Sequence, residues 1–468
     1  MTLTEKSFNI NSTNIINILF SLFPLSFILG NFALNVNTLL LCFVGIFSLK
    51  SKIFTTRLNF YIKIIFLFFF ITFFSTSLSF IDLLLYNEYE EIHLARLLKS
   101  ISFFRFFIML LIIYLLNVYN IINFKYFFIS ATFFSLLVSV DVIFQYIFGF
   151  NTIGLKGNAY FNSGFFGDEL IAGSFIQRFS FFAILFAAIF LKNKNNIKFI
   201  LVTILICSLG SGMLLTGNRM PVILFLLGLL LIFFVDVKLK KILLISLLCL
   251  SIIFKFLFSS NETYQLRYWS FYNNGVTVLV NLLNIPIREI PQGYKTDKSN
   301  EENKHNLSNK EKRILVDDFD LFWGKTYIGS GHSILFSTAL DTWKQNKVFG
   351  NGIRSFRIDC WRFHVFKEGR LCANHPHNYY LEILTETGIV GLSIILTMGL
   401  IFIIYLFRNF KLFKNNNVES FILLAAIISL ILEMFPLRSS GSFFSTTNAT
   451  YIILILSIIV SHKKFFKY

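Results

Sequence analysis

Long apolar runs joined by short polar connections constrain this chain more than any other feature of its sequence. A run of about 18 or more apolar residues can cross the hydrocarbon core of a bilayer as a helix. With 55% hydrophobic and 14% charged residues over 468 positions, the chain is too apolar for a soluble domain of its size. We therefore expect an all-α polytopic membrane protein with about 12 transmembrane helices. The apolar runs cover residues 14–31, 35–49, 59–81, 101–117, 125–148, 171–191, 197–216, 220–235, 241–258, 388–408, 418–437 and 446–461.

The basic residues indicate the orientation of these helices. A net charge of +17 on a soluble protein would suggest nucleic acid, but here most Lys and Arg lie in alternate short connections, where they set topology. We expect both termini to be cytoplasmic and no nucleic acid to be bound. The opposite connections are poorer in basic residues, and one of them carries Glu88, Glu90 and Glu91. The basic connections hold Lys50, Lys52, Arg57, Lys192, Lys194, Lys198, Lys238, Lys240, Lys241, Arg408, Lys411, Lys414, Lys463, Lys464 and Lys467.

One connection is much longer than the others and divides the chain into three parts. Residues 1–258 form an N-terminal bundle of about nine predicted helices, and residues 388–468 form about three more. Between them, residues 259–387 form one large loop on the outer side, polar in its middle and rich in Trp, Tyr, Gly and His on its flanks. This loop is where we expect the chemistry to be.

The turn from Thr216 to Pro221 places Arg219 at the outer edge of the membrane, because the connection is too short to leave the surface. One interpretation is an interfacial anchor. The other is a fixed cation for a phosphate group, since the planar guanidinium pairs phosphate oxygens in a bidentate manner. The neighbouring Gly217 would let a ligand approach closely.

Two histidines, His375 and His377, precede a predicted amphipathic helix that carries Glu382 and Glu386 on one face. A neutral imidazole that titrates near pH 7 can remove a proton from a sugar hydroxyl. Surface histidines without a role are the alternative. A metal site is a further alternative, but no third ligand stands at a standard metal spacing, so we expect neither metal nor cofactor.

A second helix is predicted upstream of the histidines, lying along an apolar surface and ended by the pair Gly350 and Gly352. This glycine pair follows a helix rather than a strand, so it is not a dinucleotide fingerprint. Arg354 and Arg357 come directly after it and point to the same region. The positions with helical spacing are Leu335, Ala339, Leu340 and Trp343.

Several polar residues fall within or beside apolar runs, where ionisable groups are costly and therefore usually pair or function. An ion pair of Asp168 or Glu169 with Arg178 is the structural interpretation, and a site is the functional one. Glu433 and Arg438 raise the same question. The remaining embedded polar residues are Asp141, Gln145, Asn162 and Gln177.

Five cysteines are present, and two of them share the large loop. The space outside a bacterial inner membrane is oxidising, so we predict a disulfide between Cys360 and Cys372 that staples the histidine segment. Closing so short a loop would contribute roughly 3 kcal/mol. Cys42, Cys207 and Cys249 lie in apolar runs and are expected to be inert.

The topology and one motif resemble the bacterial O-antigen ligase and O-antigen polymerase superfamily. The family signature is a His followed by Asn, Ser or Gln, then nine residues, a Gly, two residues and a Gly, which His377, Asn378, Gly388 and Gly391 satisfy. The turn around Arg219 looks like the family's outward Arg element, and Phe349–Gly352 resembles the segment before the signature. A second family Arg normally stands where this chain has His332, so His332, Arg267, Arg354 or Arg357 would supply that contact.

The resemblance implies a GT-C-like, metal-independent inverting glycosyltransferase of the inner membrane, with its large loop in the periplasm. Such enzymes take a glycan from undecaprenyl pyrophosphate and pass it to a lipid A–core acceptor (ligases) or to another lipid-linked glycan (polymerases). We favour the ligase. His377 would be the catalytic base and Arg219 the pyrophosphate contact. The predicted substrate-binding residues are His375, His332, Arg354, Arg357, Asn378, Glu386 and Arg178.

Two other classes remain open. A transporter of lipid-linked glycans would use charged residues along a central path, for which Asp141 and Arg178 leave room, but the large loop and the histidine motif argue against it. A structural subunit of an assembly is disfavoured by the concentration of Arg, His and Glu on one outward face.

Overall fold

The computed structural model describes residues 11–86, 90–157, 161–190, 196–235, 239–260, 262, 264–265, 268–269, 331–364, 370–408 and 418–462. All twelve apolar runs are helical, and α1 and α2 share the first of them. In the first half of the chain the helices are α1 (Ser12–Ser21), α2 (Phe23–Leu29), α3 (Asn31–Leu49), α4 (Lys52–Thr55), α5 (Phe60–Leu85), α6 (Glu91–Val118), α7 (Lys125–Phe148), the 3-10 turn η1 (Gly164–Phe166) and α8 (Ala172–Phe190). In the second half they are α9 (Asn196–Leu215), α10 (Arg219–Val235), α11 (Lys240–Ser260), α13 (Gly331–Trp343), α14 (Ser355–His364), α15 (Tyr379–Arg408), α16 (Val418–Glu433) and α17 (Thr446–Val460).

The number of helices that qualify as membrane spans is smaller than expected. Within the described residues eight helices are long and apolar enough to cross a bilayer, or nine if α1 and α2 form one bent span. The pair α1–α2 bends by 48°, with Pro24 in the first turn of α2. With 17, 16 and 15 residues, α10, α16 and α17 fall short of the roughly 20 residues that a span needs. The protein is thus an all-α multi-pass membrane protein, and a count of about 12 spans is not shown.

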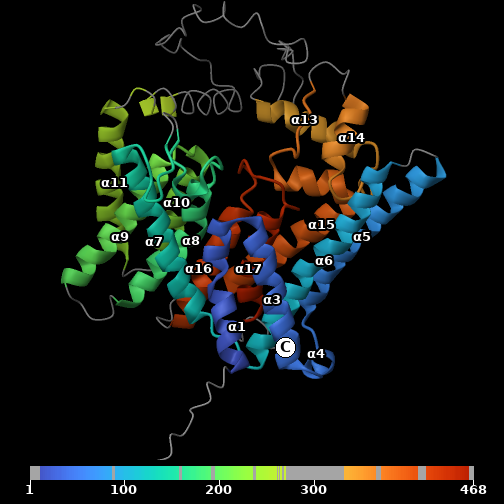
Figure 1. Cartoon of the computed structure of the whole chain (residues 1–468), viewed down its shortest axis with the longest axis horizontal. Helices are drawn as coiled ribbons and strands as arrows, with labels where there is room; N and C mark the ends of the chain where they lie inside the picture. Colours follow the sequence, from blue (N-terminus) through green and yellow to red (C-terminus); the bar gives the residue numbers. More distant parts are fainter. Residues whose placement is uncertain are drawn as a thin grey trace, which may run out of the picture.

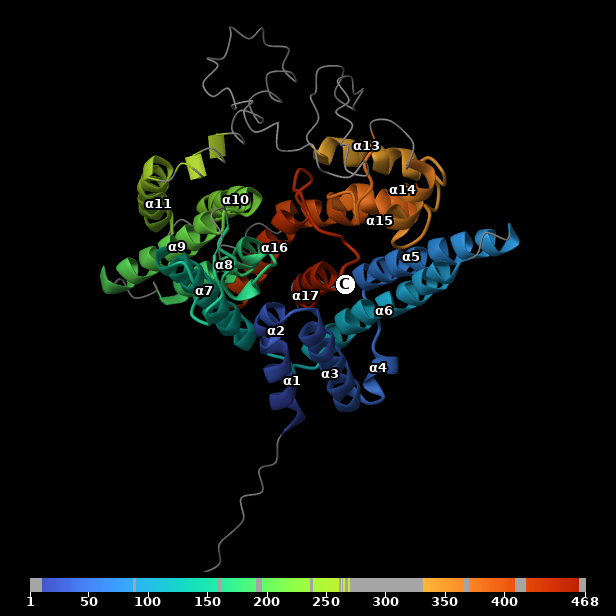
Figure 2. The same cartoon turned by 45° about the horizontal axis from the view of Figure 1, so that its top comes forward.

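The helices form two groups with α16 and α17 between them. One group contains α7 to α11, and the other contains α5, α6 and α13 to α15, as Figures 1 and 2 both show. On one side α16 packs against α8 and α10, and on the other α17 packs against α6 and α3. The bundle is therefore continuous through its centre.

Apolar side chains fill the interior of the bundle and also cover its outside. In the most apolar 18-residue stretch of each helix, 83% of the residues are buried in α8 but only 6% in α15. Large residues such as Phe54 (89% exposed) and Phe407 (80% exposed) face outwards. A soluble protein rarely exposes so much apolar surface, so these faces are suited to contact lipid.

A small second core lies in the C-terminal part of the large loop. It contains Leu335 and Ala339 of α13 and Phe356 of α14, as the helical spacing of Leu335 and Ala339 predicted. In the same core, Cys360 is bonded to Cys372, with 5.7 Å between their Cα atoms. The disulfide joins α14 to the segment that leads into the histidine motif. The expected end of the helix upstream of the histidines was wrong, because α13 stops at Trp343, well before the pair Gly350 and Gly352.

Gly388 interrupts α15, and the segment around Gly350 forms hydrogen bonds with the backbone groups at the interruption. The backbone of Gly388 is left-handed, with φ +64°, and separates a short first part of the helix from a long second part. The N–H groups of Asn351 and Gly352 donate to the carbonyl oxygens of Thr385 and Glu386, at 3.0 and 2.9 Å. A break in a helix leaves backbone groups without hydrogen-bond partners, and the segment around Gly350 supplies these partners.

The same segment also forms hydrogen bonds on the C-terminal side of Gly388. The N–H groups of Ile389 and Val390, which begin the second part of α15, donate to the carbonyl oxygens of Lys347 and Val348. The backbone around Gly350 passes so close to the backbone around Gly388 that a Cβ on Gly350 would lie 2.5 Å from the Gly388 nitrogen. Both glycines are therefore required by the crossing itself, and we refer to it as the glycine crossing.

We predict that Gly350→Ala unfolds the glycine crossing. The new Cβ would strike backbone atoms of 386–388, and the residue would have to keep a φ of +71°. Overpacking against an immovable backbone should cost about 2 kcal/mol or more. Thermal unfolding of the purified protein measures this loss of stability. The matched control is Gly399→Ala in the second part of α15, where the new Cβ meets nothing within 4 Å. Equal melting temperatures for the two variants would contradict the prediction.

Candidate functional site

The histidine pair lies in the loop that enters α15. The ring centroids of His375 and His377 are 4.2 Å apart, so the two imidazoles are in contact. His377 has a φ of +56°, which is uncommon for a residue with a side chain and costs of order 1 kcal/mol. Such a conformation persists only where the surroundings impose it. Both side chains are partly exposed.

The side chain of Asn378 explains how this loop is held at its helix end. Its Oδ1 accepts hydrogen bonds from the N–H groups of Tyr380 and Leu381, which caps the first turn of α15. Its Nδ2 donates to the carbonyl oxygen of Pro436 at 2.8 Å. Asn378, which was predicted to bind substrate, therefore uses both ends of its amide to position the loop.

The connection between α16 and α17 forms hydrogen bonds with the histidine loop and with the start of α15. The N–H of Ser440 donates to the carbonyl oxygen of His377 at 3.0 Å, and the hydroxyl of Tyr380 donates to the carbonyl oxygen of Met434 at 2.6 Å. A Cβ on Gly441 would lie 3.8 Å from Nε2 of His375. Sequence analysis singled out Arg438 of this connection but did not assign the connection to the site.

The environment of His375 keeps its imidazole neutral. Burial, followed by the charges of His377 and Arg357, lowers the pKa of His375 to about 4. Its Nδ1 atom is buried and has no hydrogen-bond partner in the described part of the chain. At neutral pH the residue next to His377 is thus an uncharged imidazole.

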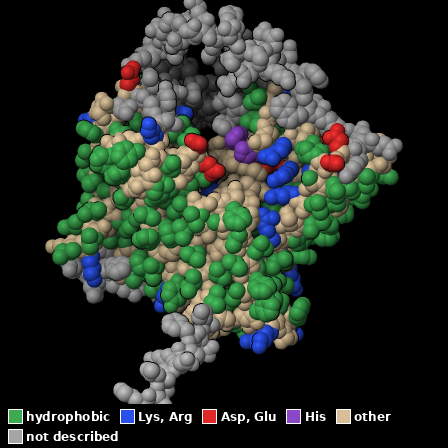
Figure 3. Space-filling view, viewed as in Figure 1, with side chains coloured by type: hydrophobic (Ala, Val, Ile, Leu, Met, Phe, Trp, Pro, Cys, Tyr) green, Lys and Arg blue, Asp and Glu red, His purple; other side chains and the backbone are tan. Residues whose placement is uncertain are grey.

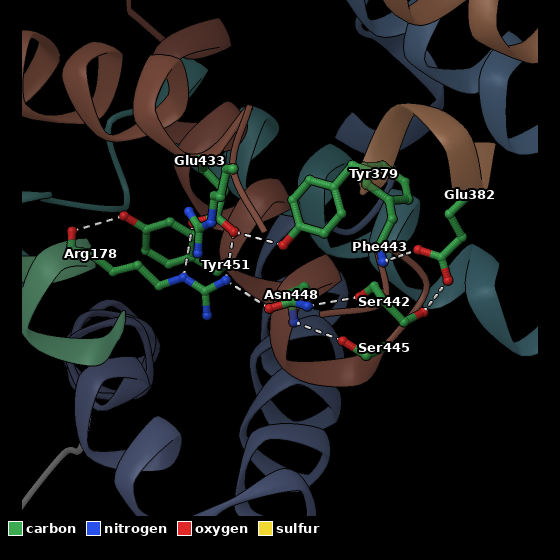
Figure 4. Close-up of polar contacts among 10 residues, drawn as sticks. Arg178, Tyr379, Glu382, Glu433, Ser442, Phe443, Ser445, Asn448 and Tyr451 are labelled. Atoms are coloured by element: carbon green, nitrogen blue, oxygen red, sulfur yellow. Dashed lines mark hydrogen bonds and ion pairs between the residues drawn. The ribbon is translucent and has the colours of Figure 1, made fainter. Parts of the chain in front are cut away.

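A buried charge network ties the histidine loop to the bundle (Figure 4). Glu433 of α16 accepts from Arg178 of α8 at 2.5 Å and from Arg438 at 2.6 Å. The hydroxyl of Tyr379, the first residue of α15, donates to the same carboxylate at 2.8 Å. Four elements thus converge on one carboxylate that is 1% exposed.

Arg178 is placed differently from the prediction. Its expected pairing with Asp168 or Glu169 was wrong, because the guanidinium pairs with Glu433 while those two carboxylates are exposed. Arg178 also donates to Oδ1 of Asn448 and lies over the Tyr451 ring at 4.7 Å. It is 6% exposed, which places it in the packing of the helices rather than at a surface open to a ligand.

The two glutamates of the amphipathic helix are also buried. Both oxygens of Glu382 accept hydrogen bonds at 2.5 Å, one from the Ser442 hydroxyl and one from the Phe443 N–H, as Figure 4 shows. Glu386, predicted to bind substrate, is 2% exposed and interacts with the backbone of Arg354. These carboxylates connect α15 to the α16–α17 connection and to the start of α14.

Arg219 begins α10 at the same end of the bundle as the histidine loop. The turn before it is tight: Asn218 donates from Nδ2 to the carbonyl oxygen of Leu170 at 2.9 Å, and Gly217 has a φ of +73°. A Cβ on Gly173 would lie 2.7 Å from the Thr216 hydroxyl, so the turn packs on the start of α8. Arg219 is half-buried on a fixed backbone.

Arg96 is a residue that sequence reasoning missed. Although it lies within a span, it is 3% exposed and donates from Nε to the carbonyl oxygen of Ile353 and from Nη2 to that of Asn351. Asp359 of α14 lies 3.5 Å from its Nη1. Arg96 thus fixes the glycine segment to α6. It lies ahead of the apolar run 101–117, so the hydrophobic pattern carried no signal for it.

The other embedded polar residues hold the loop after α7 in place. Asp141 accepts from Asn151 and from the N–H and hydroxyl of Thr152. Gln145 accepts from the Gly164 N–H, and Asn162 donates to the carbonyl oxygen of Leu215. Their contacts are structural.

Some predicted residues cannot be placed in this site. Arg267 lies outside the described residues, and of His332 only the backbone, in the first turn of α13, is described. Arg354 and Arg357 are described and exposed, close enough to His375 or Glu386 to interact electrostatically. Within the described residues, no group of three or more His, Cys, Asp or Glu side chains is arranged to hold a metal ion.

Comparison with known proteins gives one match. Residues 203–396 match the family model described as O-antigen ligase. This range begins in α9 and ends in α15, so it contains Arg219, the glycine crossing and the signature from His377 to Gly391. No curated protein matches the chain.

We predict that Glu433→Gln strongly destabilises the bundle. The substitution leaves two buried guanidinium groups without a counter-charge, and breaking a buried ion pair costs about 3–5 kcal/mol. Glu419→Gln removes an exposed carboxylate from the first turn of the same helix and should change little. Protein accumulation and thermal unfolding are the measurements. A Glu433 variant as stable as the Glu419 variant would show that the network does not hold the helices together.

Proposed function

Because the chain belongs to the O-antigen ligase and polymerase family of multi-pass membrane proteins, we propose that it transfers a glycan from undecaprenyl pyrophosphate to a lipid A–core acceptor. The single observation that supports this most is the held conformation of His377. A loop fixed by a helix cap, by the α16–α17 connection and by the glycine crossing keeps a strained histidine partly exposed at the end of the bundle.

In the proposed reaction His377 is the general base. It removes the proton from an acceptor hydroxyl, whose oxygen forms a bond to the anomeric carbon of the donor sugar while the bond from that carbon to the pyrophosphate oxygen breaks. The electron pair leaves with undecaprenyl pyrophosphate, and the proton passes from His377 to water. A single displacement inverts the anomeric centre. The neutral His375 does not repel the imidazolium that forms beside it.

Arg219 has the proposed role of neutralising the pyrophosphate as negative charge builds on it. Cations fixed in advance at such a position are among the largest contributions to catalysis. The side chains of Thr216 and Asn218 form hydrogen bonds that hold the turn from which Arg219 extends. For the second phosphate contact of the donor, His332 is proposed.

The orientation is part of the proposal. The basic connections are assigned to the cytoplasm, which puts both termini there and puts the histidine loop in the periplasm. The disulfide between Cys360 and Cys372 is consistent with that oxidising compartment. The reaction as written uses no metal, and its partners are the lipid-linked donor, the lipid acceptor and the surrounding membrane lipids.

We predict that His377→Ala and Arg219→Ala abolish glycan transfer without loss of the protein. Removal of a general base lowers a rate about 10²–10⁴-fold, and removal of a charge-stabilising group about 10²–10³-fold. Surface polysaccharide of complemented cells and transfer by the purified protein are the measurements. His462→Ala and Arg57→Ala, at the opposite end of the bundle, are the matched controls. Normal polysaccharide in both site variants would sink the proposal.

The choice between ligase and polymerase is tested by the glycan profile of a deletion strain. We expect an intact lipid A–core with no glycan chains attached, because a missing ligase leaves the chains on the lipid carrier. Lipid A–core that carries one repeat unit would instead identify a polymerase. If the purified protein transfers no glycan but moves labelled lipid between the two leaflets of a proteoliposome membrane, the protein would be a transporter.

A further inference from the structure

Four basic residues gather beside the histidine loop, and none of them is in ion-pair contact with a described carboxylate. Lys99 and Arg105 belong to α6, and Arg354 and Arg357 lie at and just before the start of α14. Figure 3 shows histidine side chains beside a run of Lys and Arg side chains on this face. We call these four residues the basic cluster.

The members of the basic cluster repel one another. Lys99 experiences the positive charges of Arg354, Arg105 and Arg357. Burial, and then the charge of Arg357, lowers the pKa of Arg354, while the buried carboxylate of Glu386 acts in the opposite direction. The nearest carboxylates, Glu382 and Glu386, are each 2% exposed and so lie behind the cluster. Like charges held together in this way favour an anion at their common surface.

Arg105 shows that the cluster is built rather than a chance grouping on a surface. Its Nη1 donates to the carbonyl oxygen of Ser102 at 2.9 Å, and its Nη2 donates to the Thr446 hydroxyl at 3.3 Å. The guanidinium lies 4.3 Å from the centre of the Phe106 ring. Its Nε is buried and has no hydrogen-bond partner within the described chain. The Arg105 guanidinium is thus held at a fixed position by contacts within α6 and with the first residue of α17.

The position of Lys99 along α6 points to a lipid headgroup rather than to free phosphate. At a rise of about 1.5 Å per residue, Lys99 lies about 28 Å from Val118 at the far end of the helix. The hydrocarbon core of a bilayer is about 30 Å thick, so Lys99 lies near its outer boundary, where headgroup phosphates are found. Beside it, Leu98 (58% exposed) and Ile101 (51% exposed) offer an apolar face for lipid chains.

We propose that the basic cluster binds the phosphate of a second, acceptor lipid, on the other side of the histidine loop from Arg219. Arg219 belongs to α10, in the group that contains α7 to α11, whereas the cluster belongs to the α6 and α14 side of the bundle (Figures 1 and 2). The two lipids would approach His377 from opposite groups of helices. This inference rests on the proposed transfer reaction and assigns the acceptor to a phosphate-bearing lipid.

The test uses the full chain in detergent and measures binding without requiring any chemistry. The probes are diphosphorylated lipid A, the same lipid after removal of its phosphates, undecaprenyl pyrophosphate and inorganic phosphate. The variant is Lys99→Gln with Arg357→Gln, since neither side chain makes a structural hydrogen bond to a described residue. The control, Arg57→Gln with Arg408→Gln, removes the same charge from exposed positions at the other end of the bundle. Thermal unfolding confirms that both are folded.

We expect the cluster variant to bind diphosphorylated lipid A at least about tenfold more weakly than the wild type, while its affinity for the dephosphorylated lipid and for undecaprenyl pyrophosphate is unchanged. The control variant should bind all probes as the wild type does. Wild-type affinity of the cluster variant for diphosphorylated lipid A would overturn the proposal. An equal loss of undecaprenyl pyrophosphate binding would assign the cluster to the donor, and inorganic phosphate binding as tightly as the lipid would make it a free-phosphate site.

A failure of the proposed function would look different. If His377→Ala kept its transfer activity, the reaction assigned to the histidine would be wrong whatever the lipid-binding assay gave. If transfer depended on His377 but lipid A binding did not depend on Lys99 and Arg357, only the acceptor site would be wrong.

Discussion

The glycine crossing is the constraint on which the rest of the site depends. A helix broken at Gly388 leaves backbone groups unpaired inside protein, and the Lys347–Gly352 segment pairs with them on both sides of the break. The crossing fixes the direction of the short first part of α15, and thereby the position of the loop before it. It also explains two positions of the family signature in physical terms. Gly388 permits the left-handed break, and Gly391 leaves room for the Thr387 side chain.

Charge buried in the bundle fixes the other side of the same loop. Glu433 joins α8, α16 and the first residue of α15, while Asn448 and Ser442 extend the network to Glu382 (Figure 4). A buried ionic network is costly unless every member is satisfied, and this one holds elements that are 255 residues apart in sequence. The benefit is positional: a general base must lie within hydrogen-bond reach of its substrate, and a rigid loop lowers the entropy lost in reaching that geometry.

Much of the architecture was predictable, because hydrophobic length and helical spacing are local properties. All twelve apolar runs are helices, and α13 buries Leu335 and Ala339 as their spacing required. The partner of Arg178 was not predictable, since pairing across the bundle depends on how helices pack and Asp168 was only nearer in sequence. The cap formed by Asn378 could have been predicted, because Asn directly before an apolar helix is a common start signal. The repair of α15 by Asn351 and Gly352 could not, because it joins two backbones whose proximity no local pattern encodes.

The central claim is that Arg219 and His377 act on one donor headgroup. A structure of the protein with bound undecaprenyl-pyrophosphate-linked glycan, determined by cryo-electron microscopy, tests it most directly. The account predicts a pyrophosphate oxygen within roughly 3 Å of the Arg219 guanidinium, and an anomeric carbon that faces His377 across a space the size of one hydroxyl. A pyrophosphate bound away from Arg219, or packed protein between the sugar and His377, would contradict it.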